Sequence, residues 1–148
     1  IWDNIRLKGG AYGGGCGFLN GNYFYMYSYR DPNVNKSYEV FKNVGNYLSE
    51  IDMDQKHLNR FIIGAVNVED APLKNNRINS IVLRRHYNGV TQERLDLRRE
   101  EMLSVSINDI REVGQELTTA MENIVMSTVS DQTSIEKSEL FKNIIVVK

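Results

Sequence analysis

The sequence predicts an α+β fold in which helices pack on a mostly antiparallel sheet. Two observations support this prediction. Near the amino terminus, apolar and aromatic side chains alternate with a period of two after an Asn-Gly turn, as they do in a β-hairpin. From residue 31 onward, apolar residues recur at helical spacing between capping residues, which is typical of amphipathic helices.

The amino-terminal region is expected to form one helix end and one hairpin. Ile1 to Lys8 reads as the end of a helix that Gly9-Gly10 closes, because glycine readily adopts the left-handed conformation that ends a helix. Tyr12 to Phe18 reads as a glycine-weakened strand, and Asn20-Gly21-Asn22 as the hairpin turn. The second strand of the hairpin is then the aromatic run Tyr23 to Tyr29.

The tyrosines of this second strand fall on alternate positions and therefore share one face. They are Tyr23, Tyr25, Tyr27 and Tyr29, while Phe24 and Met26 point to the other face. A row of tyrosines could stack on the bases of a single-stranded nucleic acid, but such platforms have basic neighbours. The strand has no Lys or Arg before Arg30, so we interpret the tyrosines as core residues of a strand covered on both faces.

The rest of the chain is predicted to be mainly helical, with two more strands near its end. Helices are expected to start at Asp31-Pro32, after Asp54, before Ile78, after Thr91 and after Ser106, where Ser106 and Asp109 resemble a capping box. The third of them ends at Asn88-Gly89. Ile124 to Val129 and Ile144 to Val147 are predicted strands, separated by a short helix over Ser134 to Leu140.

Length and composition indicate an ordinary globular chain. The 148 residues suffice for one core, and we expect a single partial domain over residues 1–148. The chain opens at Ile1, inside what already reads as structure, so we expect a fragment of a longer protein. Hydrophobic residues make up 41% and the net charge is −1, which favours neither nucleic acid nor a membrane as a partner.

The glycine-rich segment from Gly9 to Gly17 does not match a nucleotide-binding loop. A phosphate loop of the Walker type contains Gly-Lys followed by Ser or Thr, and no Gly-Lys pair occurs in the chain. The segment also leads into a strand instead of a helix. Glycines in a strand let a second backbone approach, so an extended peptide could pair with this edge, but a bulge or a tight hairpin explains them equally well.

No catalytic metal site is visible in the sequence. A zinc peptidase helix needs two His and a Glu in one short motif, whereas the two histidines, His57 and His86, lie far apart. Asp52 and Asp54 begin like a calcium loop without its glycine, and helix capping explains Asp54 better. The single cysteine, Cys16, cannot form an internal disulfide and is interpreted as a small packed residue.

Several segments in order resemble one peptidase family. They are Trp2 to Gly14, Ser28 to Asn33, Leu48 to Asp54, Ile62 to Gly64, and Arg98 to Leu103. These segments are similar to the presequence protease and falcilysin branch of the insulinase (pitrilysin) clan of zinc peptidases. The resemblance implies that the chain is the carboxy-terminal part of the last insulinase-type domain.

The resemblance also implies how such a chain works. In this family the zinc motif lies in the amino-terminal half, and the carboxy-terminal half closes over it to form a chamber in which unfolded peptides are degraded without ATP. An Arg and a Tyr of the last domain reach the bound peptide near the zinc, and the matching residues are Arg6 and Tyr12. With Gly13 and Gly14 they form the expected substrate-binding set, and Arg6 and Tyr12 are the expected catalytic residues.

These implications set the expected cofactor and partners. Zinc is expected in the intact enzyme with ligands outside this chain, so residues 1–148 alone should bind no metal and be inactive. The expected partners are peptide substrates and the amino-terminal half of the same protein. Relatives occur in bacteria, mitochondria and plastids, and the sequence leaves the compartment open.

Two other functions remain compatible with the sequence. The parent protein could be a non-catalytic structural or peptide-binding homologue, because the zinc ligands that would decide this lie elsewhere. The chain could also be a stand-alone peptide-binding module, although a piece of a larger sheet should expose an unpaired edge. Such an edge also predicts self-association of the isolated fragment.

Overall fold

The computed structural model of the chain describes residues 1–19 and 23–146, which divide into two compact units. The first unit consists of Ile1–Glu50 and Val113–Lys148, and the second of Ile51–Glu112. Helices and one antiparallel sheet are both present, so the predicted α+β class is confirmed. A single partial domain over residues 1–148 stays a prediction.

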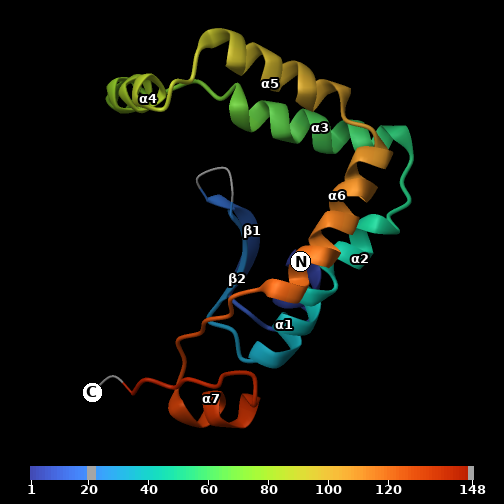
Figure 1. Cartoon of the computed structure of the whole chain (residues 1–148), viewed down its shortest axis with the longest axis vertical. Helices are drawn as coiled ribbons and strands as arrows, with labels where there is room; N and C mark the ends of the chain where they lie inside the picture. Colours follow the sequence, from blue (N-terminus) through green and yellow to red (C-terminus); the bar gives the residue numbers. More distant parts are fainter. Residues whose placement is uncertain (20–22, 147–148) are drawn as a thin grey trace. The chain divides into compact units, whose positions relative to one another are not determined.

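The first unit contains the sheet and most of the short helices (Figure 1). Its elements are the π-helix η1 (Asp3–Leu7), β1 (Gly13–Leu19), β2 (Tyr23–Tyr29), α1 (Val34–Lys42), α2 (Val44–Ser49), the part of α6 (Ile107–Ala120) from Val113 on, the 3-10 helix η2 (Met121–Asn123) and α7 (Gln132–Ser138). The helix predicted to start at Asp31-Pro32 starts at Val34 and is interrupted at Asn43.

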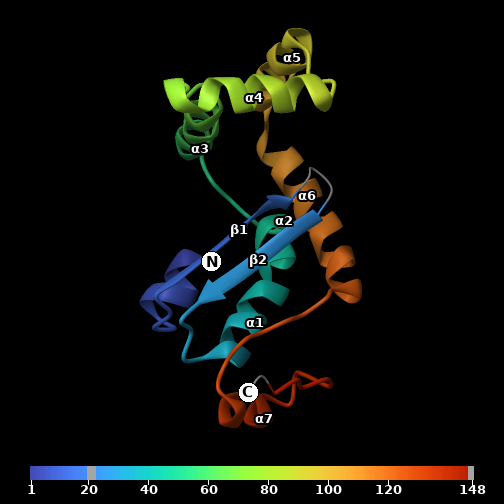
Figure 2. The ribbon, with the colours of Figure 1, turned by 90° about the vertical axis from the view of Figure 1, so that its left-hand side faces the viewer.

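The hairpin predicted from the glycines and tyrosines is present as an antiparallel pair (Figure 2). The register runs from Gly13 opposite Tyr29 to Leu19 opposite Tyr23. The predicted turn at residues 20–22 lies outside the described residues. Among the described residues the sheet has these two strands only, so each strand has one edge without a partner. The predicted self-association of the isolated fragment stays a prediction.

The core of the first unit lies between the hairpin, η1 and α1. Ile5, Ala11 and Phe41 are its buried apolar residues, and Met26 and Tyr38 pack against them. Since Met26 lies on the face of β2 opposite to the tyrosines and packs with Phe41 of α1, the hairpin turns its Met26 face toward α1. The ribbon shows α1 next to the hairpin (Figure 1).

Helices α2 and α6 meet backbone to backbone within this unit. A β-carbon on Gly114 would lie 2.7 Å from the carbonyl carbon of Leu48 and 2.9 Å from the oxygen of Gly45. A β-carbon on Gly45 would lie 2.5 Å from the nitrogen of Thr118. The two glycines therefore allow an approach that no other residue would permit.

The two strands predicted near the carboxy terminus are wrong. Residues 124–129 and 144–146 have no regular secondary structure, and Val147 lies outside the described residues. Both runs are rich in β-branched residues, but such preference produces a strand only where a neighbouring strand pairs with it. The first run is held by a side chain, since the hydroxyl of Tyr38 donates to the carbonyl of Ser127 at 2.9 Å. Burial raises the pKa of Tyr38 above the usual value of a phenol.

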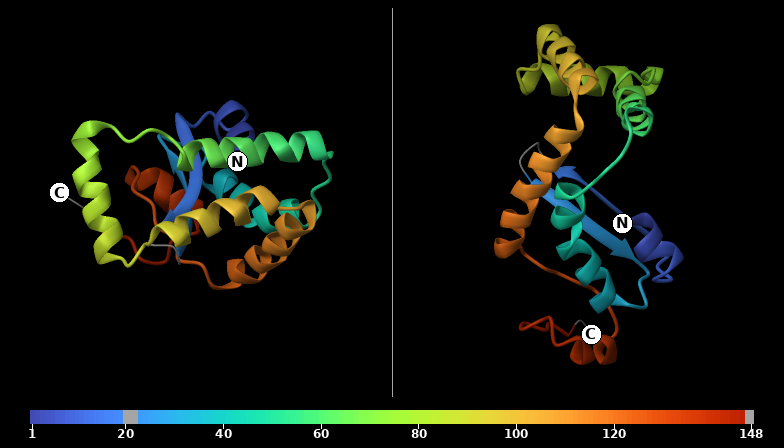
Figure 3. Two further views of the ribbon diagram at one scale, coloured as in Figure 1. Left: turned by 90° about the horizontal axis from the view of Figure 1, so that it is seen from above. Right: turned by 90° about the vertical axis from the view of Figure 1, so that its right-hand side faces the viewer.

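The second unit contains α3 (Gln55–Glu69), α4 (Asn75–Tyr87) and α5 (Gln92–Ser104) (Figure 3). Helices α3 and α5 lie side by side and are joined by two ion pairs, Arg98 with Glu69 at 3.6 Å and Arg99 with Asp70. Leu58 on α3 is only 2% exposed.

Three of the predicted helix starts, at Asp54, Thr91 and Ser106, are confirmed by capping contacts. The carboxylate of Asp54 accepts from the backbone N–H of His57 at 2.7 Å, and the hydroxyl of Thr91 accepts from that of Arg94 at 3.3 Å. The backbone N–H of Ser106 donates to Asp109 at 2.7 Å, as in a capping box. No helix in the described ranges is long and apolar enough to cross a membrane.

The glycine contact between α2 and α6 yields a first prediction. Replacing Gly114 with Ala should destabilise the chain by about 1–3 kcal/mol, because the new methyl group can be accommodated only if the two backbones move apart. Chemical denaturation of the purified chain measures this difference. Gly64 is the matched control, since it lies inside α3 with open space around its β-position. Ala at position 64 should stabilise the helix by about 0.5–1 kcal/mol, and equal losses at both positions would contradict the contact.

A second prediction concerns the acidic capping residues. A hydrogen bond from the backbone N–H of His57 lowers the pKa of Asp54, and one from the backbone N–H of Ser106 lowers the pKa of Asp109. Hydrogen bonding to Ser134, through its side chain first and its backbone second, lowers the pKa of Asp131. A carboxyl group whose pKa is lower in the folded state stabilises the fold above its unfolded-state pKa and loses this effect as the pH falls through its folded-state pKa. The thermal midpoint should therefore fall on acidification below about pH 4. The variant Asp109→Asn should show a shallower fall, and an unchanged acid slope would contradict the assignment.

Candidate functional site

One short hydrogen-bonded turn carries both Arg6 and Tyr12. The N–H of Gly10 donates to the carbonyl of Arg6 at 3.0 Å, and the N–H of Ala11 donates to the carbonyl of Ile5 at 3.1 Å. Gly10 has a φ of +79°, which permits the reversal of the chain. The turn therefore fixes the backbone position of Tyr12 relative to the backbone of Arg6.

The guanidinium group of Arg6 lies over an aromatic ring. Its Cζ atom is 4.5 Å from the centre of the Trp2 ring, which is a favourable cation–π distance. Arg6 is exposed, and it forms no ion pair with any described residue. Stacking on Trp2 leaves its N–H donors free to bind a ligand.

Tyr12 stands immediately before β1 and is 67% exposed. Its backbone N–H donates to the carbonyls of Tyr29 at 3.1 Å and Arg30 at 3.3 Å. Its ring meets the ring of Tyr29 edge to face, with centroids 5.9 Å apart, while its hydroxyl forms no hydrogen bond with the described residues. The phenol is thus anchored by its backbone and ring but has a free donor.

The side chains of Arg6 and Tyr12 have separate aromatic neighbours, Trp2 for the first and Tyr29 for the second. The structure brings their backbones together through the turn. It places the two side chains at its surface, each with unused hydrogen-bonding capacity.

The two glycines of the predicted substrate-binding set have different surroundings. A β-carbon on Gly13 would meet nothing within 4 Å, so backbone approach at this position is open. A β-carbon on Gly14 would lie 3.2 Å from Cγ2 of Ile5, so packing against the core explains a glycine there. The role of both glycines in binding substrate stays a prediction.

The interpretation of the strand tyrosines as core residues is wrong. Tyr23, Tyr25, Tyr27 and Tyr29 are between 46% and 69% exposed. Tyr25 and Tyr27 lie against Gly17 and Gly15: the β-position of Gly17 is 3.0 Å from the Tyr25 hydroxyl oxygen, and that of Gly15 is 3.1 Å from a ring carbon of Tyr27. Cys16, expected to be packed, is exposed as well. The alternation of residues correctly predicted that the tyrosines share one face of β2. Helix α1 packs on the opposite face, which carries Met26, so the tyrosine face is left exposed.

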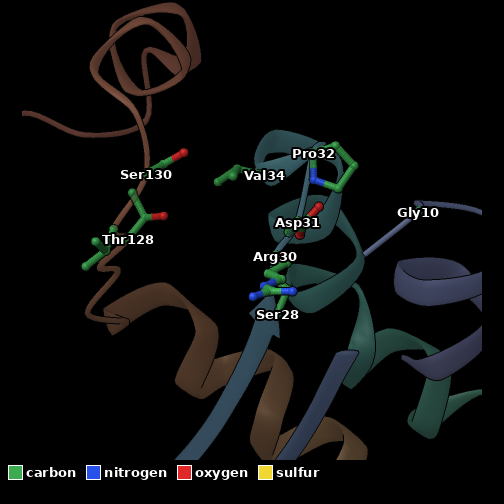
Figure 4. Close-up of a pocket in the computed structure, with 9 residues that line it drawn as sticks. Gly10, Ser28, Arg30, Asp31, Pro32, Val34, Thr128 and Ser130 are labelled. Carbon is green, nitrogen blue, oxygen red and sulfur yellow. The ribbon is translucent and has the colours of Figure 1, made fainter. Parts of the chain in front are cut away.

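A polar pocket of about 460 Å³ lies where β2 ends (Figure 4). Ser28, Arg30 and Asp31 line it from the side of β2, and Thr128 and Ser130 line it from the carboxy-terminal segment. The Oδ2 atom of Asp31 is buried and has no hydrogen-bond partner among the described residues.

The segment after β2 is also tied to the turn that carries Tyr12. The Oδ1 atom of Asp31 accepts from the N–H of Asn33 at 2.8 Å, and the Nδ2 atom of Asn33 donates to the carbonyl of Gly9 at 2.7 Å. The roles of Arg30, Asp31 and Asn33 were not recognised in the sequence, where the only signal was the resemblance of Ser28 to Asn33. The segment after β2 therefore stabilises the turn through the hydrogen bond from Asn33 to Gly9.

The described residues do not fit a catalytic zinc site. Residues 1–19 and 23–146 contain no group of three His, Cys, Asp or Glu side chains that could hold a metal ion. His57 and Asp54 do approach, with Nδ1 2.7 Å from Oδ1, but Asp54 caps helix α3. This pair is explained by the helix start.

Comparison with known proteins points to one family. Residues 1–133 match the family described as the PreP C-terminal domain. The chain is 34% identical over 149 residues to "Presequence protease 1, chloroplastic/mitochondrial" of Arabidopsis thaliana, covering 96% of this chain and 14% of that protein. It is 35% identical over 127 residues to the mitochondrial presequence protease of Saccharomyces cerevisiae (81% and 12%) and 29% identical over 145 residues to "Protein HypA" of Clostridium perfringens (97% and 15%). The chain thus spans 15% or less of the length of these relatives.

The link between Asn33 and Gly9 yields a third prediction. Replacing Asn33 with Ala removes a partly buried hydrogen bond and should lower the free energy of unfolding by about 1 kcal/mol. Urea denaturation of the chain measures the loss. The exposed Asn76 on α4 is the control, and Ala there should not destabilise the chain. If both variants unfolded at the same urea concentration, Asn33 would not support the turn.

Proposed function

Because the chain belongs to the PreP C-terminal domain family, as its resemblance to presequence proteases predicted, we propose that it supplies two substrate-orienting donors to a peptidase. The donors are the guanidinium of Arg6 and the phenol of Tyr12. The observation that carries the proposal is that both groups are exposed on one turn and that neither side chain donates a hydrogen bond within the described structure.

The ordinary structural explanations for these two residues account poorly for what is seen. A surface arginine commonly forms an ion pair, yet Arg6 forms none with the described residues. A tyrosine at a strand end commonly packs into the core, yet Tyr12 is 67% exposed. The Gly9-Gly10 turn keeps these two exposed groups at fixed backbone positions, as a binding function requires.

The chemistry of peptide hydrolysis needs donors of this kind. Attack on the peptide carbonyl develops negative charge on its oxygen, and a donor already in place stabilises that charge at little reorganisation cost. The phenol of Tyr12 is a neutral single donor that suits this oxygen. The planar guanidinium of Arg6 carries several N–H donors and can hold neighbouring carbonyls of the same peptide.

The rest of the proposed enzyme lies outside these residues. We propose that the substrates are unfolded peptides, in keeping with relatives named as presequence proteases. The amino-terminal half would enclose them together with this chain, without ATP. That half would also bind a zinc ion, which when bound polarises the scissile carbonyl and activates water. Residues 1–148 alone would then be inactive, and Gly13 and Gly14 would allow close approach of the peptide backbone.

The alternative of a non-catalytic homologue is not favoured, because the named relatives include several presequence proteases. It would be restored if the parent protein lacked a His-x-x-Glu-His motif in its amino-terminal half. No separate observation supports a stand-alone peptide-binding module.

A fourth prediction tests the role of Tyr12. In the full-length protein that contains this chain, Tyr12→Phe should lower kcat for a peptide substrate by on the order of 10²–10³, the usual loss for one donor to a developing oxyanion. The ring contact with Tyr29 is retained in this variant, so its folding should be unchanged. Steady-state kinetics with an internally quenched peptide measures kcat and KM separately.

A variant of another tyrosine serves as the control, and a variant of Arg6 tests the second donor. Tyr25→Phe removes the hydroxyl of another exposed tyrosine, on β2, and should leave kcat unchanged. Arg6→Gln should raise KM as well as lower kcat, since it removes contacts to the bound peptide. Unaltered kcat in Tyr12→Phe would refute the proposed role.

A further inference from the structure

Arg30 is held in an unusual backbone conformation at the point where β2 ends. Its φ is +47°, in the left-handed region that residues with a β-carbon rarely adopt. Such a conformation is unfavourable for arginine, and surrounding contacts must maintain it. Glycine or asparagine would occupy this position more easily, so a reason is needed for the arginine side chain.

The guanidinium group of Arg30 lies near the rings of two tyrosines. Its Cζ atom is 5.8 Å from the centre of the Tyr12 ring and 5.5 Å from that of the Tyr29 ring. Both distances lie within the range of cation–π attraction. Because the two rings also meet edge to face, the guanidinium completes a three-membered cluster around the Tyr12 ring.

The backbone of Arg30 holds Tyr12 as well. The carbonyl of Arg30 shares the N–H of Tyr12 with the carbonyl of Tyr29. Arg30 forms no ion pair with the described residues, and the neighbouring Asp31 is engaged with Asn33. The contacts of Arg30 are therefore directed at Tyr12 and its neighbour Tyr29.

We propose that Arg30 is a positioning residue that holds the Tyr12 ring in the orientation required for its hydroxyl to reach a substrate carbonyl. This inference rests on the proposed function of Tyr12. The single ring contact with Tyr29 would leave the exposed Tyr12 ring free to change rotamer. The guanidinium restricts that freedom, because an edge-to-face pair and a cation over the ring face constrain different directions.

The left-handed backbone of Arg30 makes a sharp experiment possible. In the full-length protein, Arg30→Gly removes the side chain and also relieves the unfavourable φ, so the variant should unfold at the same temperature as the parent or higher. Its kcat for a peptide substrate should nevertheless fall by roughly ten- to a hundredfold, because small misplacements of a catalytic group have effects of this size. KM should change little, since Arg30 acts through Tyr12 and not on the bound peptide.

Three further variants distinguish this role from others. Arg30→Lys retains a cation over the ring and should recover part of kcat. In a protein that already carries Tyr12→Phe, Arg30→Gly should have no further effect on kcat, because the hydroxyl it positions is gone. Arg94→Gln, on the exposed surface of α5, is the control for loss of an arginine elsewhere and should retain full activity.

The possible results are separable. A higher KM with unchanged kcat in Arg30→Gly would mean that Arg30 binds substrate directly, which overturns the inference and leaves the role of Tyr12 intact. Multiplicative losses in the double variant would overturn it as well. Loss of kcat in step with loss of thermal stability would mean a structural role only. Full activity of Tyr12→Phe would refute the proposed function, and the inference with it.

Discussion

The hydrogen bond from the N–H of Ala11 to the carbonyl of Ile5 closes the turn on which the proposed site depends. The Ile5 side chain is 1% exposed, so the acceptor end of this bond is fixed in the core. Gly9 must be a glycine, since a β-carbon there would overlap the Ile5 carbonyl, and Gly14 leaves room for the Ile5 side chain. Because the turn is anchored in this way, two exposed side chains at its ends can be placed reproducibly without contacting each other.

The helices were predictable because their signals are local. Asp54 and Thr91 cap the helices that follow them, and each cap acts within three residues of its own position. The hairpin is local too, since its strands are close neighbours in the chain. Residues 124–129 have similar strand preference but no paired strand in the described structure, and preference alone cannot provide one. Whether the tyrosine face is covered is likewise decided by what packs on it, which the alternation of residues does not reveal.

The candidate site was predictable only where a recognisable segment carried it. Arg6 and Tyr12 follow from the resemblance of Trp2 to Gly14, and the structure adds that both are exposed. Arg30 and Asn33 approach the turn through contacts between segments some twenty residues apart, for which no spacing rule exists. A left-handed arginine is also contrary to local preference, and such contradictions are where sequence-based expectation fails and function is often found.

The close contact of Gly114 with Leu48 and Ser49 has a consequence for the chain as a whole. The polypeptide leaves the first unit at Glu50 and re-enters it at Val113, so the departure and return points adjoin. A segment inserted between adjoining points can vary in length and content without straining its host, because the entropic cost of loop closure grows slowly with length. The connection that precedes α6 could thus be lengthened, or exchanged for a reporter module, while the body that presents the guanidinium and the phenol keeps its architecture.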